Sequence, residues 1–228
     1  MAAHTKIIDL FGLPACGKTS LTRYISEQYG ERLKIATMPI LVQEAKKDKG
    51  RLRKAFSPRY FSAGFRLRLL APFDKKRRII PLFNWPSHAR YYSYAKKYPD
   101  YDIVLVDHGD IQDIVSLERG EDLHNNNRFS NGCIRYLNLS LADLYVYCNV
   151  PTEIALERMQ LRGRNSGRID VMGDVAEQLQ ALESEKRRFD YFAGMLSKKK
   201  DKFVELDMNK PVEQIAESIM NVIIGKVL

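Results

Sequence analysis

The sequence has few cysteines and no long apolar run. Its three cysteines, Cys16, Cys133 and Cys148, are an odd number and far apart, which excludes a disulfide framework and a C-x-x-C site. The four histidines show no metal-ligand spacing, which argues against a structural metal. No segment approaches the roughly 20 apolar residues of a membrane span, and the first residues lack the order of a secretory signal. We therefore expect a cytoplasmic protein without a transmembrane segment.

The net charge of +9 over 228 residues is unevenly distributed. Between Lys46 and Lys97 there are 16 basic residues against two acidic ones, whereas the rest of the chain has 21 basic and 26 acidic residues. The same segment contains ten aromatic residues, a mixture that suits phosphate contacts and base stacking. A nucleic-acid acceptor is therefore one alternative, although aromatic residues at helical spacing are more often part of a core.

Short apolar segments alternate with helical patterns along most of the chain. We expect strands at 6–12, 33–40, 101–107, 142–150 and 202–207, and helices at 17–29, 151–163, 174–197 and 211–224. This alternation predicts an α/β fold around a mainly parallel sheet, in a single domain over 1–228. From about residue 43 to 99, arginine-rich helical segments separated by prolines predict a helical insertion over one edge of the sheet.

A phosphate-binding motif follows the first expected strand. Gly12, Gly17, Lys18 and Thr19 match G-x-x-x-x-G-K-[ST], with a strand before and a helix after. In this arrangement successive backbone N–H groups and the helix N-terminus converge on phosphate oxygens. Lys18 would reach the terminal phosphates, and the hydroxyl of Thr19 would ligate Mg²⁺. Cys16, inside the loop, is interpreted as a spacer in preference to a reactive thiol.

An aspartate ends the most apolar strand. Asp107 follows four consecutive aliphatic residues, so it should lie at the carboxyl end of a central strand, where open α/β sheets bind their ligands. There it can hold Mg²⁺ or accept a proton from an attacking hydroxyl. The alternative is an aspartate that caps the next helix.

Four arginines cluster near a glycine-bracketed stretch. Arg158 and Arg162 are one helical turn apart, and Arg164 and Arg168 follow Gly163. Guanidinium groups compensate the charge of a phosphoryl group in transfer, and such a stretch can close over bound substrate. We therefore predict a lid over about residues 158–173, against the alternative of a basic helix C-terminus.

In this order and spacing, the three motifs resemble the P-loop nucleoside and nucleotide kinases, most closely thymidylate-kinase-like proteins. The resemblance implies a three-layer P-loop NTPase fold with a mainly parallel five-stranded sheet, a basic helical insertion that binds the acceptor, and ATP and Mg²⁺ as cofactors. It implies that Asp107 is the carboxylate after the third strand, that the four arginines form the lid, and that the turn Leu206–Pro211 flanks adenine. The implied ATP phosphate loop consists of Gly12, Leu13, Pro14, Ala15, Cys16, Gly17, Lys18, Thr19 and Ser20.

One residue departs from the thymidylate kinase pattern. These enzymes usually follow the aspartate with an arginine that grips the acceptor's phosphate, whereas His108 stands here, which puts thymidylate itself in question. Arg59 or Arg128 are candidates to replace that arginine, and Gln112 is a candidate to read a polar edge of the acceptor. For each of these three, a solvated surface residue is an equally good explanation.

The sequence thus predicts an ATP- and Mg²⁺-dependent kinase that acts on a small molecule, most plausibly a nucleotide or nucleoside. One alternative is a polynucleotide 5′-hydroxyl kinase, and the other is a regulatory P-loop switch with a basic partner-binding surface. The guanine-reading N-K-x-D of Ras-like switches is missing from the sequence. The oligomeric state does not follow from the sequence, and a dimer is compatible with it.

Overall fold

The sheet has five strands, all parallel. The computed structural model describes residues 5–55, 57–70, 87–98, 100–117, 127–163, 169, 172–199 and 201–226. The strand order is β2-β3-β1-β4-β5, and every neighbouring pair is parallel. The strands are β1 (Lys6–Phe11), β2 (Ile35–Thr37), β3 (Ile103–Val106), β4 (Leu144–Asn149) and β5 (Phe203–Asp207). The expected mainly parallel five-stranded sheet is confirmed.

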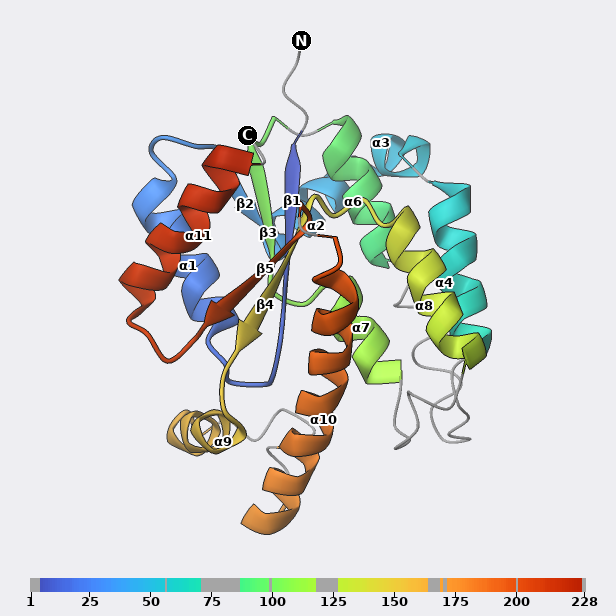
Figure 1. The fold of residues 1–228 in the computed structure, drawn as a ribbon. Coiled ribbons are helices and arrows are strands. Elements are labelled where there is room, and N and C mark those ends of the chain that lie inside the picture. Colours follow the sequence, from blue (N-terminus) through green and yellow to red (C-terminus); the bar gives the residue numbers. More distant parts are fainter. Residues whose placement is uncertain are drawn as a thin grey trace.

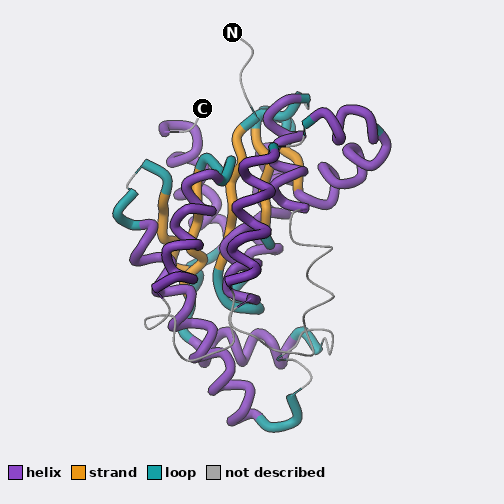
Figure 2. Tube along the Cα trace, turned by 90° about the vertical axis from the view of Figure 1, so that its right-hand side faces the viewer, coloured by secondary structure: helices purple, strands orange, loops and turns teal. Residues whose placement is uncertain are grey.

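Helices cover both faces of this sheet. On one face lie α1 (Lys18–Tyr29) and α11 (Val212–Lys226), and on the other lie α2 (Met38–Lys47), α6 (Ser87–Lys97), α7 (Asp110–Leu117) and α10 (Val175–Leu196) (Figure 1). Figure 2 shows the same sheet between helices in the turned view. The helix α9 (Thr152–Leu161) lies past the end of β4. The three-layer prediction is therefore confirmed.

The basic insertion extends beyond these three layers. Its described part contains the end of α2, then α3 (Lys49–Lys54), α4 (Pro58–Leu70) and α6. α2 and α6 cover one face of β3 and β1, so the insertion covers this face of the sheet and is not confined to its edge. α4 packs against α8 (Asn127–Leu139) as a helix pair outside that layer (Figure 1).

The second strand is shorter than the sequence predicts. Only Ile35–Thr37 is extended, and the chain becomes helical at Met38, whereas a strand was expected up to Ile40. Pro39 lies in the first turn of α2, where its missing N–H has no helical partner to lose and its fixed φ suits the helix. The proline therefore marks the start of a helix, not only the end of a strand.

A carboxyl group lies inside the core. Asp9 of β1 is fully buried, and its Oδ2 accepts hydrogen bonds from the hydroxyl of Tyr92 on α6 (3.1 Å) and from the backbone N–H of Asp110 on α7 (2.9 Å). The carboxylate of Asp110 in turn accepts hydrogen bonds from Tyr136 Oη (2.7 Å) and from Ser140 Oγ. One buried network thus links the central strand to α6, α7 and the end of α8.

Asp9 is tightly enclosed and resists ionisation. A Cβ at Gly109 would collide with its carboxyl group, so the turn after β3 packs directly on it. Among the described residues, no hydrogen-bond partner reaches Asp9 Oδ1. Burial, followed by the charge of Asp110, raises the pKa of Asp9 well above its usual range. Asp9 therefore keeps its proton to higher pH in the folded protein than in the unfolded chain.

We expect the Asp9→Asn variant to become more stable relative to the wild type as the pH rises. In the unfolded chain Asp9 ionises near pH 3.9, whereas the fold retains the proton, so the wild-type protein loses stability above that pH. Asparagine keeps an acceptor oxygen but cannot ionise. The free energy of unfolding of the variant relative to wild type, measured by urea unfolding between pH 4 and 8, should increase by up to about 1.4 kcal/mol per pH unit.

Tyr92→Phe is the control, because it removes a hydrogen bond to the same carboxyl group without removing the acid. It should lower the stability by a similar amount at each pH. A difference between Asp9→Asn and wild type that stays constant over this range would contradict an elevated pKa of Asp9.

Candidate active site

The loop between β1 and α1 forms the cradle that the sequence predicts. Gly12 has a φ of 147° and Gly17 a φ of 106°, both in the region that favours glycine. A Cβ at Gly12 would lie 2.5 Å from the carbonyl oxygen of Cys148 on β4, so the loop fits closely against the neighbouring strand. The first turn of α1 contains no acidic residue. Its N-terminal partial charge is therefore available to an anion.

Lys18 is folded over this loop. Its Nζ donates hydrogen bonds to the carbonyl oxygens of Gly12 and Leu13, both at 2.9 Å, and lies 3.4 Å from the sulfur of Cys16. The ammonium group thus lies over the cradle, bound to carbonyls that a phosphate would replace as its partners. This position fits the role that the motif gives to the lysine.

Cys16 is a buried part of the loop. A hydrogen bond from Cys148 lowers the pKa of Cys16, burial opposes this, and the charge of Lys18 lowers it further, to about 6. The side chain is fully buried, which withholds the sulfur from solvent reagents. Its role as a spacer within the loop stays a prediction.

The two predicted metal ligands are in direct contact. Thr19 Oγ1 donates a hydrogen bond to Asp107 Oδ2 at 2.7 Å. The strand register explains this proximity, because Asp9 pairs with Val106, the last residue of β3, and the next residue of the chain is Asp107. A hydroxyl and a carboxylate at this edge are oxygen ligands that Mg²⁺ prefers. Within the described residues no group of three or more His, Cys, Asp or Glu side chains could hold a metal, so phosphate and water would supply the other ligands.

Arg158 connects the loop to the turn after β5. From α9, its two terminal nitrogens donate hydrogen bonds to the carbonyl oxygens of Met208 (3.0 Å) and Cys16 (3.4 Å). The side chain of Met208 lies 3.3 Å from the position of a Cβ on Gly17. The structure therefore brings Arg158 and part of the predicted adenine-flanking turn, Leu206–Pro211, to the cradle.

The rest of the predicted lid is only partly described. Arg162 follows the end of α9 and is exposed. Arg164 and Arg168 lie outside the described residues, so their positions in the lid stay predictions. α10 then begins at Val175, after the N-cap Asp174 accepts a hydrogen bond from the backbone N–H of Ala176.

Two histidines share one carboxylate beside Asp107. Asp113 Oδ2 lies 2.7 Å from His88 Nδ1 on α6, and Asp113 Oδ1 lies 3.4 Å from His108 Nε2. Burial lowers the pKa of His88, but the charge and hydrogen bond of Asp113, with the charge of Asp110, raise it to about 9. Burial raises the pKa of Asp113, but the two histidines hold it below its usual value. The pair is therefore a buried ion pair at neutral pH.

Two of the three candidate acceptor residues, Gln112 and Arg59, lie far apart in the structure. Gln112 is buried on α7, and its Oε1 has no hydrogen-bond partner among the described residues. Arg59 is exposed on the first turn of α4, which begins near α3, at the other end of the molecule from the cradle (Figure 1). The side chain of Arg128 lies outside the described residues. Gln112 is therefore on an element that borders the candidate site, whereas Arg59 is not.

Sequence reasoning missed the polar residues that support the site. Asp9 and His88 did not stand out, because their hydrogen-bond partners Tyr92, Asp110 and Asp113 are 25 or more residues away in the chain. The role of Asp113 likewise depends on its contact with the distant His88. A weak signal was present in the segment from His108 to Asp113, where two aspartates three residues apart follow Asp107 on one helix.

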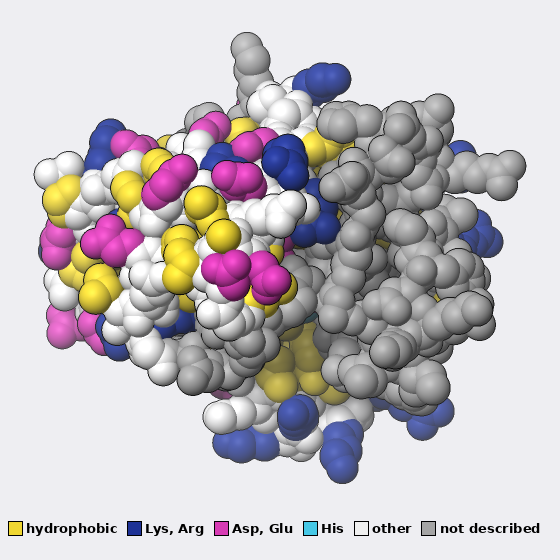
Figure 3. Space-filling model, turned by 90° about the horizontal axis from the view of Figure 1, so that it is seen from below, with side chains coloured by type: hydrophobic (Ala, Val, Ile, Leu, Met, Phe, Trp, Pro, Cys, Tyr) yellow, Lys and Arg dark blue, Asp and Glu magenta, His cyan; other side chains and the backbone are white. Residues whose placement is uncertain are grey.

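Figure 3 views the end of the molecule that contains the cradle and shows a hollow with hydrophobic side chains in its floor.

The sequence matches no family model, and no curated protein sequence is significantly similar to it. Solved structures are similar in fold. Three of them are structures of deoxyadenosine kinase from M. mycoides. The first contains the products dCMP and a flexible dCDP, the second contains dCTP, and the third contains dATP. Their TM-scores are 0.57, 0.51 and 0.53, at 19%, 19% and 20% identity. The alignments cover 96%, 96% and 94% of this chain and 99%, 99% and 97% of the matched chains.

The fold is therefore that of the P-loop nucleoside kinases, which confirms the fold that the motifs predict. At this level of identity the likeness establishes the fold, while the reaction and its residues depend on the site. Within the described residues, none of the helices is both long and apolar enough to cross a membrane.

We expect Asp113→Asn to lower the pKa of His88 from about 9, because burial is then opposed only by the charges of Asp110 and Asp9. The C2 proton resonance of His88, titrated by NMR and assigned with His88→Gln, measures this. The wild-type pair stabilises the fold fully below about pH 6.5, and this contribution is lost as the pH rises through about 9. An unchanged His88 titration in Asp113→Asn would contradict the pairing.

Proposed function

We propose that this protein is an ATP- and Mg²⁺-dependent kinase that phosphorylates a small molecule of the nucleoside class. The observation that carries the proposal is the contact of Thr19 Oγ1 with Asp107 Oδ2 at 2.7 Å, directly beside the loop over which Lys18 is folded. A phosphate cradle alone would suit many nucleotide-binding proteins. The carboxylate on the neighbouring strand adds the group that phosphoryl transfer requires at this edge.

The loop from Gly12 to Ser20 would hold the ATP phosphates. Its N–H groups and the N-terminus of α1 bind the anion, and Lys18 would exchange the carbonyls of Gly12 and Leu13 for the terminal phosphates. Thr19 and Asp107 would hold Mg²⁺, which when bound neutralises charge on the phosphate oxygens. Asp107 is also placed to accept the proton of an attacking hydroxyl.

The arginines divide into two roles in this proposal. Arg158 is already bound to the main chain at Cys16 and Met208, so it would hold the loop and the adenine-flanking turn in place. Arg162, Arg164 and Arg168 would supply the positive charge of the lid to the phosphoryl group in transfer. The proposal therefore separates a positioning arginine from three that would contact the phosphates.

His108 supports a nucleoside in preference to a nucleoside monophosphate as acceptor. An arginine at this position would offer an unpaired positive charge to an acceptor phosphate, whereas His108 lies 3.4 Å from the carboxylate of Asp113. The imidazole is thus directed to Asp113 and is not placed to contact an acceptor phosphate as that arginine would be. The ligands named for the three similar structures, all deoxynucleotides, support a nucleoside or nucleotide as the acceptor class.

Transfer of γ-labelled phosphate from Mg·ATP tests the proposal. The purified protein is offered nucleosides, nucleoside monophosphates, sugars and 5′-hydroxyl oligonucleotides, and we expect label on nucleosides. Lys18→Ala should lower kcat by roughly a hundred-fold or more, because the transferring phosphoryl group loses a charged partner. Lys198→Ala, which removes an exposed lysine beyond α10, is the matched control and should be fully active.

Normal turnover in Lys18→Ala would refute the role of the loop. ATP binding with no label on any acceptor would refute the kinase and favour the regulatory switch. Label on oligonucleotides alone would favour the polynucleotide 5′-hydroxyl kinase.

We expect Arg158→Ala to act mainly on ATP binding. Loss of its two hydrogen bonds frees the loop carbonyl of Cys16 and the turn at Met208, so the KM for ATP should rise roughly ten-fold, the cost of about 1.4 kcal/mol in binding. Steady-state kinetics with varied ATP measure this. A kcat that falls strongly with an unchanged KM would instead place Arg158 on the transferring phosphoryl group.

A further inference from the structure

A basic surface lies on the insertion, away from the candidate active site. It is formed by exposed lysine and arginine side chains at the end of α2, on α3, at the start of α4 and at the end of α6. These residues are Lys46, Lys47, Lys49, Arg51, Arg53, Lys54, Arg59 and Lys97. The acidic residues near them are Glu44, which accepts a hydrogen bond from Tyr101 Oη at 2.5 Å, and Asp48, which caps α3 and lies 3.3 Å from Arg51.

The helices that carry this surface are firmly held. Leu52 and Ala55 are buried, the guanidinium of Arg51 lies 5.7 Å from the centre of the Tyr98 ring, and Lys97 Nζ donates a hydrogen bond to the carbonyl of Lys54 at 3.4 Å. Cations in the last turn of a helix are locally favourable, by about 0.3–1 kcal/mol each. That effect explains a few lysines or arginines, but not a surface where like charges crowd together with little compensation.

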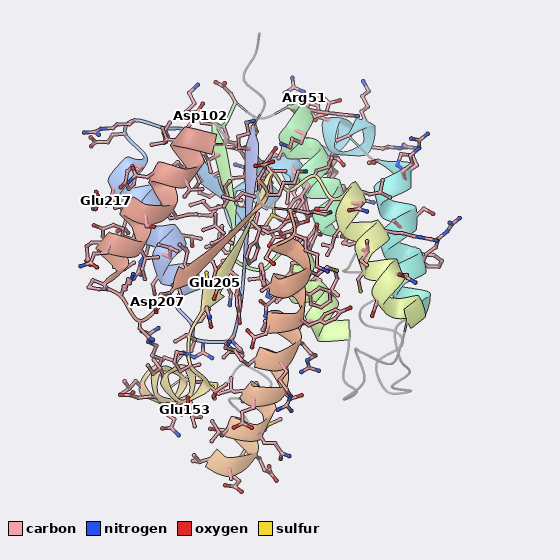
Figure 4. All side chains as sticks on the ribbon, in the orientation of Figure 1. Arg51, Asp102, Glu153, Glu205, Asp207 and Glu217 are labelled. Atoms are coloured by element: carbon pink, nitrogen blue, oxygen red, sulfur yellow. The ribbon has the colours of Figure 1, made fainter. Side chains whose placement is uncertain are left out.

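The surface and the cradle lie at opposite ends of the sheet. Lys96, next to Lys97, donates a hydrogen bond to the carbonyl of Thr5, which directly precedes β1, whereas the phosphate loop follows the other end of that strand. A six-residue strand spans roughly 20 Å. In Figure 4, Arg51 lies at one end of the molecule and Glu153, on the helix that carries Arg158, lies at the other. The surface is therefore too distant to hold the acceptor at the cradle.

We propose that this basic surface binds the phosphate backbone of a double-stranded nucleic acid, without base specificity and separately from the active site. A duplex presents about one negative charge per 1.7 Å, a density that several neighbouring cations can match. Binding would release condensed counterions, so it would weaken steeply with salt.

The side chains around these cations argue against other anionic partners. Among the described residues of these helices, the exposed large hydrophobic side chains are Ile40 on α2 and Phe65 on α4, and none lies on α3 or α6. A membrane-binding helix buries a continuous apolar face in the lipid, whereas these are single side chains on two different helices. Tyr94 is buried, and Tyr98 is half-buried and packs against it with ring centres 5.7 Å apart, so neither ring is free to stack on an unpaired base.

Fluorescence anisotropy with a short labelled DNA duplex tests this inference on the full chain. The test variant combines Lys49→Gln, Arg53→Gln and Lys54→Gln, three exposed positions of the basic surface. The matched control combines Arg23→Gln, Arg32→Gln and Arg187→Gln, exposed positions on other elements with the same change in charge. We expect the test variant to bind about a hundred-fold more weakly at low salt. Its slope of log K against log salt should be shallower by about 2.7, from three lost phosphate contacts.

The outcomes are separable from those of the kinase assay, because both triple variants should transfer phosphate like the wild type. Equal losses of duplex affinity in the test and control variants would show that the effect depends on net charge alone. That result would refute the proposed binding surface. Duplex binding that the test variant retains would also refute it. Binding to vesicles of phosphatidylcholine and phosphatidylserine with no binding to the duplex would overturn the inference in favour of an anionic membrane.

Discussion

Asp9 places a carboxyl group inside the sheet, where it receives hydrogen bonds from the main chain of Asp110 and from the hydroxyl of Tyr92. This group determines where the chain goes after β3, because Gly109 packs directly against it. The position of Asp107, two residues earlier, follows from that turn. A polar group in an apolar core is costly unless it is paired, so the network that satisfies it also selects one arrangement of the surrounding helices.

Parallel pairing then brings the chemistry together at one edge. β1 and β3 are neighbours in register, so the loop that follows β1 and the aspartate that follows β3 emerge side by side. β4, on the other side of β1, supplies the carbonyl of Cys148 that closes the back of the loop at Gly12. Three strands that are distant in the sequence thus form one cradle, and Arg158 attaches the turn after β5 to it.

The parts of the site that sequence reasoning found are those with local signals. The cradle is encoded in eight consecutive positions, Gly12 to Thr19, and Asp107 is marked by the apolar strand before it. Alternation of strands and helices was sufficient to predict an α/β fold around a mainly parallel sheet, and the resemblance to P-loop kinases added the three layers. Pro39 shows the limit of a local signal, since the same residue can end a strand or begin a helix, and the packing of α2 on β3 decides between them.

The remaining features depend on contacts that leave no pattern in the sequence. Arg158 has the spacing of a lid residue, but it binds backbone carbonyls of Cys16 and Met208, whose positions only the fold defines. The ion pair of His88 with Asp113 joins the insertion to the main domain across 25 positions. Charge counting likewise located the basic segment but could not show that many of its cations point away from the cradle.

The contact between Gly109 and Asp9 also constrains how this protein can vary in evolution. A side chain at position 109 would occupy the space of the carboxyl group at position 9, and a residue without an acceptor at position 9 would leave the N–H of Asp110 buried without this partner. A side chain at position 109 therefore requires a smaller residue at position 9, a hundred residues earlier in the chain. Related sequences that gain a Cβ after the β3 aspartate should have a smaller residue in the middle of their first strand.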